Sequence, residues 1–199
     1  EAESQGQSSR EGQRQDRACH EEERVIAIHE SGHALVAMLC PKATPPEKIS
    51  LTQDMEGALG YVLREARARP YALTAEEMRA DICVGLGGQA AERLVIGEIS
   101  IGASMDLRQA THVARAMVED YGMSQSVGPR VMTVDDRVID GRGVSESLRT
   151  QIDHEIDRIL REEKERAEKL LKDNLHLHAA LVELLLEKKV LDASAIKSF

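Results

Sequence analysis

The residues best suited to chemistry form the run His29-Glu30-Ser31-Gly32-His33, in which two histidines stand four positions apart around a glutamate. In a helix, residues at this spacing lie on one face, so both imidazoles can reach a single cation. The intervening glutamate can then address a water molecule on that cation. The run is the H-E-x-x-H pattern typical of zinc peptidases, in which the histidines bind the metal and the glutamate is the general base.

The motif lies inside a mostly apolar segment, residues 21–40, which we predict to be a buried helix. Burial of two histidines and a glutamate without partners would cost roughly 2–7 kcal/mol per unpaired polar group. A metal ion would satisfy all three side chains at once, whereas a chance match would leave them as hydrogen-bonded core residues. Gly32 costs about 1 kcal/mol relative to alanine inside a helix, so we expect another backbone to pack closely there.

The composition indicates a compact, mainly helical domain, because 199 residues with 42% hydrophobic content can bury a real core. With only 2% aromatic residues, that core should consist of Leu, Ile, Val, Ala and Met. The net charge of -9 and the lack of a concentrated basic patch argue against nucleic acid as the main partner.

The cysteines and the apolar runs indicate the expected environment. Cys19, Cys40 and Cys83 form no C-x-x-C pair, which favours a reducing compartment over a disulfide framework and makes a cysteine zinc site unexpected. No run approaches the 18 or so continuous apolar residues needed to span a bilayer, and no signal peptide is recognisable. We therefore expect a soluble domain without a membrane segment.

The motif must be positioned by the remaining elements, which we predict to be mainly helices with a small β hairpin or sheet edge. Residues 1–18 are polar and are predicted to be a disordered linker or a tail left by cloning, so the domain would span residues 19–199. The predicted elements are strands at 48–51, 57–63 and 131–134, helices at 74–95, 104–122, 145–174 and 175–190, and a last turn capped by Asp192.

The predicted helix at residues 74–95 begins with a capping box formed by Thr74 and Glu77. Gly87 and Gly88 lie in its interior, where they are costly unless they allow a neighbour to approach closely. The natural neighbour is the helix that carries His29 and His33.

A catalytic zinc ion normally takes three protein ligands and leaves one position for water. Asp106 and Glu92 are the best candidates for the third ligand, because each lies near apolar residues in a helix that must pack on something. Spacing alone leaves the choice between them open. The other histidines are more simply explained as solvated or hydrogen-bonded side chains: His20, His112, His154, His176 and His178.

Several motifs in a fixed order extend this reading. The runs HESGHAL, GALGY, LGGQAAE and GASMDL begin at His29, Gly57, Leu86 and Gly102. In this order they resemble the landmarks of the peptidase domain of FtsH-type AAA proteases, and the resemblance covers roughly residue 21 to the end. Several ordered motifs are far more specific than one H-E-x-x-H pattern.

The resemblance implies a zinc endopeptidase domain that works as a homo-hexameric ring on unfolded polypeptides delivered by an ATP-driven unfoldase. It implies that His29 and His33 bind one Zn²⁺ per chain, that Glu30 is the general base and that Asp106 is the third ligand. Glu92 would then orient a ligand histidine. An extended substrate would add to the strand at residues 57–63 by backbone pairing.

The sequence also departs from the family pattern. It has no G-x-x-x-x-G-K-[ST] loop, so neither a nucleotide-binding domain nor ATP is expected in this chain. The full-length protein would place the domain at the cytoplasmic face of a bacterial or organellar membrane for protein quality control. The alternative function is a catalytically inactive ring scaffold that binds partner proteins, against which the intact His29, Glu30, His33 and Asp106 argue.

Overall fold

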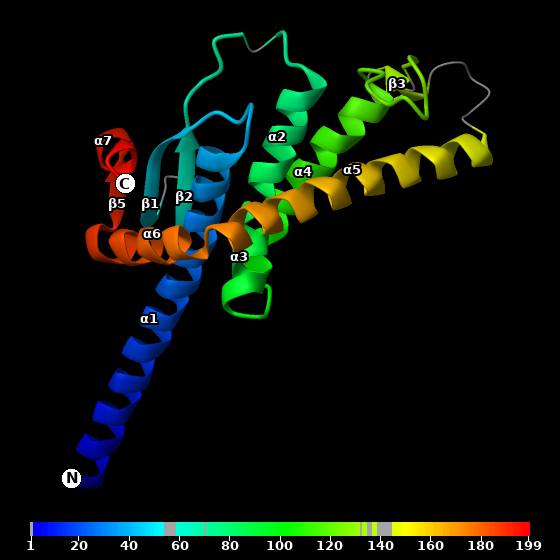
Figure 1. Cartoon of the computed structure of the whole chain (residues 1–199). Coiled ribbons are helices and arrows are strands. Elements are labelled where there is room, and N and C mark those ends of the chain that lie inside the picture. Colours follow the sequence, from blue (N-terminus) through cyan, green and yellow to red (C-terminus); the bar gives the residue numbers. More distant parts are fainter. Residues whose placement is uncertain (1, 54–58, 70, 132, 135–136, 139–144) are drawn as a thin grey trace.

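A computed structural model describes the backbone of residues 2–53, 59–69, 71–131, 133–134, 137–138 and 145–199, and side chains from residue 19 on, outside 53–59, 70 and 132–144. Helices dominate these residues, and a small antiparallel sheet accompanies them, as predicted (Figure 1). The elements are α1 (Ala2–Leu39), β1 (Pro46–Gln53), β2 (Leu59–Arg64), α2 (Ala75–Gly85), α3 (Gly87–Val95), a 3₁₀ turn η1 (Ile101–Ala103), α4 (Ser104–Glu119), β3 (Thr133–Val134), β4 (Arg137–Val138), α5 (Glu146–Asp173), α6 (Leu175–Lys188), β5 (Val190–Asp192) and α7 (Ala193–Lys197).

The larger sheet has the strand order β2-β1-β5, with both pairs antiparallel. Ile49 of β1 stands between Val62 of β2 and Leu191 of β5, and its side chain is fully buried. The hairpin of β1 and β2 confirms the sequence prediction. The short strand β5 was not predicted, because three residues carry too little pattern to be recognised. Within this sheet β2 is an edge strand.

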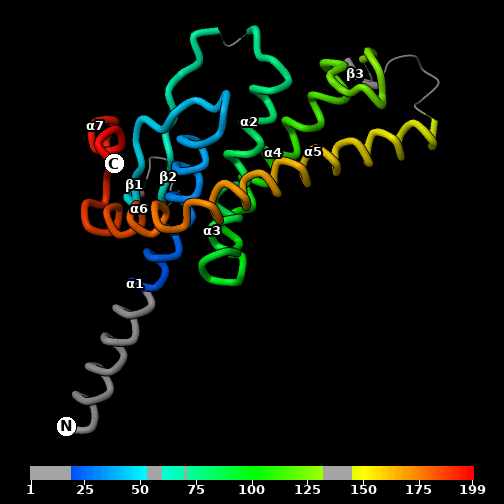
Figure 2. The backbone as a smooth tube through the Cα atoms, viewed as in Figure 1, coloured from blue at the N-terminus to red at the C-terminus, as the bar shows by residue number. Residues whose placement is uncertain are grey.

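Two apolar clusters form the core. The first joins α1, the sheet, α3, α6, α7, part of α2 and the C-terminal part of α5, and the second joins the rest of α2, α4 and the N-terminal part of α5. Figure 2 shows α5 running along both groups, with the sheet beyond one end and α4 beside the other. Ile152 of α5 lies in the second cluster and Leu171 in the first. This long helix therefore ties the two halves of the domain together.

Two helix predictions need correction. The helix expected at residues 74–95 is two helices, because Leu86 ends α2 and begins α3 with φ -88° and ψ -3°. The capping box of Thr74 and Glu77 at its start is confirmed. The motif helix begins at Ala2 instead of near residue 21. That residues 1–18 are a linker or tail outside the domain stays a prediction.

The predicted helices at 104–122, 145–174 and 175–190 are confirmed as α4, α5 and α6 within a few residues. Asp192 caps α7 as expected, accepting a hydrogen bond from the Ala195 amide at 2.8 Å. In the described part of the chain, no helix combines the length and apolar character needed to cross a membrane.

Glu155 of α5 links that helix to the segment after α4. Its side chain is 6% exposed and accepts hydrogen bonds from Ser124 Oγ at 2.9 Å and Arg158 Nη2 at 2.7 Å. The bonds from Arg158 lower the pKa of Glu155 to about 2; burial opposes this effect and the bond from Ser124 adds to it. The ion pair therefore stabilises the fold above the unfolded pKa of 4.5, and this contribution is lost as the pH falls toward 2.

We expect Glu155→Gln to lower the free energy of unfolding at pH 7 by about 1–2 kcal/mol. The pKa shift alone would give a larger value, but Arg158 is half exposed and solvent screens the ion pair. The difference from the parent should shrink as the pH is lowered through the window between 4.5 and about 2. Urea unfolding followed by circular dichroism at pH 7 and pH 3 measures it. Glu187→Gln, at an exposed position, serves as control. If Glu155→Gln lowers the free energy of unfolding by the same amount at pH 7 and pH 3, the prediction is wrong.

Candidate metal centre

The helix α1 presents the motif toward α3, and glycines set the distance between them. A Cβ atom on Gly32 would lie 2.6 Å from the carbonyl oxygen of Gly87, and one on Gly87 would lie 2.9 Å from that of Gly32. Such distances are far below van der Waals contact, so the two backbones touch only because both residues are glycine. The close approach predicted from the glycines is confirmed.

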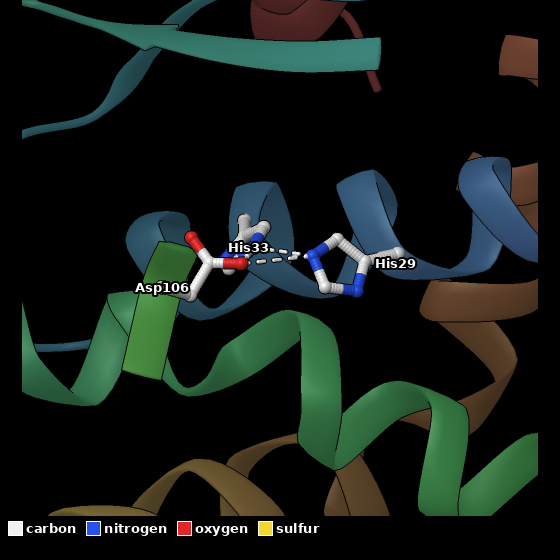
Figure 3. A group of neighbouring side chains, drawn as sticks. All are labelled: His29, His33 and Asp106. Atoms are coloured by element: carbon white, nitrogen blue, oxygen red, sulfur yellow. Dashed lines mark hydrogen bonds and ion pairs between the residues drawn. The ribbon is translucent and has the colours of Figure 1, made fainter. Parts of the chain in front are cut away.

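Three side chains from distant parts of the sequence converge at this contact (Figure 3). His29 and His33 come from α1, and Asp106 comes from the first turn of α4. His29 Nε2 lies 3.0 Å from His33 Nε2 and 3.1 Å from Asp106 Oδ2, and His33 Nε2 lies 3.4 Å from the same oxygen. The two histidines are 8% exposed and the Asp106 side chain is 31% exposed, so the histidines are shielded from water and the aspartate is partly open to it.

The outer nitrogens of both rings have partners of their own. His29 Nδ1 lies 2.6 Å from Glu92 Oε1, and His33 Nδ1 lies 2.7 Å from the carbonyl oxygen of Val84. A carbonyl or carboxylate oxygen only accepts, so each Nδ1 must carry the proton. In the neutral rings both Nε2 atoms therefore present lone pairs toward each other and toward the Asp106 carboxylate.

Such an arrangement favours a positive charge at its centre. Burial by itself would lower the pKa of His29, but the hydrogen bond to Asp106 and the charge of Glu30 outweigh it and raise the pKa to about 9. For Asp106, burial acts to raise the pKa, but the hydrogen bonds that the two histidines donate when they are protonated hold it well below its usual range. The site thus favours positive charge strongly, whether a proton or a metal ion supplies it.

The donor set fits zinc. Ligand atoms 2.0–2.1 Å from a tetrahedral zinc ion lie about 3.3 Å apart, which matches the three separations between the donor atoms. Gly88 makes room for the set, because a Cβ atom there would lie 2.5 Å from His29 Nε2 and 2.6 Å from His33 Nε2. Two imidazoles and one carboxylate, each histidine held from behind by an acceptor, are ligands that suit this metal.

Glu30 lies beside the donor set and not within it. It is 8% exposed and lines a cavity of about 810 Å³ together with His29, His33 and Asp106. Burial raises the pKa of its carboxyl group, and the two histidines oppose that shift. A Cβ atom on Gly60 of β2 would lie 3.1 Å from Glu30 Oε1, so the carboxylate faces the edge strand. A buried carboxylate with a raised pKa suits proton transfer near neutral pH.

The structure separates the two acids between which spacing could not choose. Asp106 faces the Nε2 side of the histidines, whereas Glu92 contacts Nδ1 of His29 from behind and is 1% exposed. Glu92 is held in turn by Ser100, whose amide donates to Oε2 at 2.5 Å and whose hydroxyl donates to Oε1 at 3.0 Å. Sequence reasoning missed Ser100 and the Val84 carbonyl, because neither carries a recognisable signal.

The remaining histidines do not join the cluster. His178 is buried and lies with Nε2 3.0 Å from the carbonyl oxygen of Ile28, where it ties α6 to α1. The others are exposed on the surface: His20, His112, His154 and His176.

The fold and the site define a mainly helical domain in which two histidines of an H-E-x-x-H helix and one aspartate of another helix form a cluster. The model of peptidase family M41 matches residues 17–199, so the chain belongs to this family. It is 37% identical over 186 residues to the ATP-dependent zinc metalloprotease FtsH of Syntrophobacter fumaroxidans, covering 89% of this chain and 29% of the relative. It is 39% identical over 196 residues to FtsH 1 of Methylacidiphilum infernorum, covering 94% and 30%.

A third relative is the ATP-dependent zinc metalloprotease FtsH of Thermotoga maritima, with 32% identity over 183 residues, 88% of this chain and 30% of the relative. The chain thus spans less than a third of the length of these relatives. The family assignment agrees with the resemblance seen in the sequence.

Proposed function

We propose that this domain is a zinc-dependent endopeptidase in which His29, His33 and Asp106 hold one Zn²⁺. The observation that carries the proposal is the convergence of three donor atoms within 3.4 Å, with both histidine protons committed to acceptors on the opposite side of the rings. The names of the relatives, which are zinc metalloproteases, support the choice of metal.

When bound, Zn²⁺ would polarise the scissile carbonyl and lower the pKa of a coordinated water to about 7. Glu30 is the proposed general base: it takes a proton from the attacking water and later donates it to the leaving amine. Its raised pKa brings the carboxyl group closer to the range in which it can perform both transfers. Glu92 and the Val84 carbonyl hold the rings of His29 and His33 in the tautomer that leaves Nε2 free for the metal.

Substrate binding is proposed at β2. This strand is the edge of the sheet next to the cavity, and Gly60, Tyr61 and Val62 line that cavity. An extended polypeptide can add to such an edge through backbone hydrogen bonds, which depend little on side-chain sequence. Unfolded chains are therefore the proposed substrates, because folded proteins do not offer a free extended backbone.

The full-length protein is proposed to couple this domain to an AAA ATPase in a homo-hexamer that serves protein quality control. The support is that the relatives are named ATP-dependent and are more than three times as long as the matched region. ATP would then act through a domain other than the one described. A reducing compartment, at the cytoplasmic face of a membrane, stays the proposed location.

Zinc content by elemental analysis, measured with cleavage of fluorescent casein with and without a chelator, tests the proposal. One equivalent of zinc and chelator-sensitive cleavage are expected. Zinc without cleavage, even after fusion to an active unfoldase, would favour the inactive ring scaffold. Absence of zinc at equilibrium with micromolar Zn²⁺ would overturn the metal site.

The ligand choice makes its own prediction. Asp106→Ala should bind zinc at least about ten-fold more weakly than Glu92→Ala, because Asp106 supplies a donor atom and Glu92 only orients His29. Competition with a chromogenic chelator measures both affinities. The exposed Glu98→Ala controls for loss of negative charge. If Asp106→Ala binds zinc as tightly as Glu98→Ala, the ligand assignment is wrong.

A further inference from the structure

Ser100 holds the carboxylate of Glu92 at both of its oxygens. The Ser100 amide donates to Glu92 Oε2 at 2.5 Å, and the Ser100 hydroxyl donates to Oε1 at 3.0 Å. The same Oε1 lies 2.6 Å from Nδ1 of His29. A carboxylate that is bound at both oxygens has a fixed plane, so the oxygen that faces His29 is fixed in direction. Ser100 therefore acts on the His29 ring through Glu92.

The same hydroxyl group also fixes the start of the helix that carries Asp106. Ser100 is the N-cap of η1, and its Oγ accepts a hydrogen bond from the Gly102 amide at 3.2 Å. The turn η1 continues directly into α4, and Asp106 lies in the first turn of that helix. Ala103, the N-cap residue of α4, has no side-chain oxygen that could cap it. The entry to α4 therefore depends on the cap that Ser100 provides one turn earlier.

The two roles of the Ser100 hydroxyl group are compatible. A carboxylate oxygen only accepts hydrogen bonds, so the hydroxyl proton must point to Glu92, and a lone pair remains for the Gly102 amide. Glu92 belongs to α3 and is 1% exposed, whereas Gly102 belongs to η1. One hydroxyl group thus connects the residue that orients one proposed zinc ligand with the element that leads to another.

We propose that Ser100 is a positioning residue that raises the affinity of this domain for Zn²⁺. Its hydroxyl group aligns the His29 ring through Glu92, and it aligns the Asp106 carboxylate through the start of α4. The inference rests on the proposed function and deepens it. Ligands held in place before the metal arrives lose less freedom on binding, which is why partners behind the ligands affect metal affinity.

Ser100→Ala should bind zinc about ten-fold more weakly than the parent in competition with a chromogenic chelator. Ser100→Thr keeps the hydroxyl group and should bind zinc as tightly as the parent. The added methyl group is tolerated, because Ser100 is exposed and its extended backbone suits a β-branched residue. Ser145→Ala is the matched control: Ser145 caps α5 through the Leu148 amide and lies outside the metal cavity. Its zinc affinity should equal that of the parent.

A double-mutant cycle separates positioning from a general loss of stability. In a Glu92→Ala background, Ser100→Ala should reduce zinc affinity by a smaller factor than in the parent, because the route through Glu92 is already lost. The cobalt(II)-loaded proteins provide a second readout, since their visible absorption depends on the geometry of the ligands. Ser100→Ala should alter this spectrum, whereas Ser100→Thr and Ser145→Ala should keep that of the parent.

Three results would overturn the role of Ser100 alone in a parent that binds one zinc ion. The first is equal zinc affinity of Ser100→Ala and the parent. The second is an equal loss of affinity in Ser145→Ala, which would indicate general destabilisation. The third is a Ser100→Ala effect that is undiminished in the Glu92→Ala background. A parent that binds no zinc would overturn the proposed function and the role of Ser100 with it.

Discussion

A Glu30→Gln variant should retain one zinc ion per chain and cleave casein about 10³-fold more slowly than the parent. Glutamine preserves the size of the side chain, and Glu30 is not among the donor atoms that converge on the metal position. The variant therefore removes only the group proposed to accept the proton. Because the pKa of Glu30 is raised by burial, replacement by a neutral amide should not weaken the fold.

The measurement combines elemental analysis with initial rates on fluorescent casein. Glu21→Gln is the matched control, since it makes the same chemical change at an exposed position of the same helix. Its rate should equal that of the parent. Cleavage by Glu30→Gln at the parent rate would show that another group takes the proton.

Gly88→Ala is the second variant with a large expected effect, and it should bind zinc at least about 100-fold more weakly than the parent. The added methyl group would lie 2.5 Å from both Cε1 and Nε2 of His29 and 2.6 Å from His33 Nε2. Both rings must move to relieve this contact, so the donor atoms lose the separation that suits a tetrahedral ion.

Gly85→Ala is the control, because a Cβ atom there meets nothing within 4 Å. Gly85 is the last residue of α2, on the other side of the break at Leu86, and alanine suits a helix better than glycine, so zinc affinity should be unchanged. Thermal unfolding of the zinc-free proteins separates metal loss from misfolding. If Gly88→Ala bound zinc as tightly as Gly85→Ala, the contact between α3 and the two rings could not be as close as the structure has it.

The helix that carries the H-E-x-x-H motif shows which structural features short-range sequence patterns can predict. Two histidines four residues apart share a helix face by geometry alone, and Gly32, Gly87 and Gly88 indicated a close helix contact before its position was known. The strands of the hairpin and most helices also follow from periodicity and capping. These features depend on neighbours within a few residues, which is why the sequence reveals them.

The break at Leu86 was missed for a physical reason. Residues 75–95 continue a helical pattern, and no proline marks a stop. The turn between α2 and α3 lets Gly87 and Gly88 meet α1 and brings the Val84 carbonyl to His33. Contacts between helices override local propensity there.

By itself, then, the sequence determined the H-E-x-x-H helix, the mainly helical class and a short set of acids that could complete the metal cluster. Spacing left the choice between Asp106 and Glu92 open, and the resemblance to FtsH-type proteases favoured Asp106. Only the tertiary structure places the two carboxylates, which contact His29 at opposite nitrogens. Asp106 lies 77 residues after His29 in the sequence, and Glu92 lies 63 residues after it. The positions of these two carboxylates therefore depend on how α4 and α3 pack against α1. Spacing within one helix is set by its backbone geometry, whereas the side of a ring that a distant residue reaches is set by packing of the whole domain.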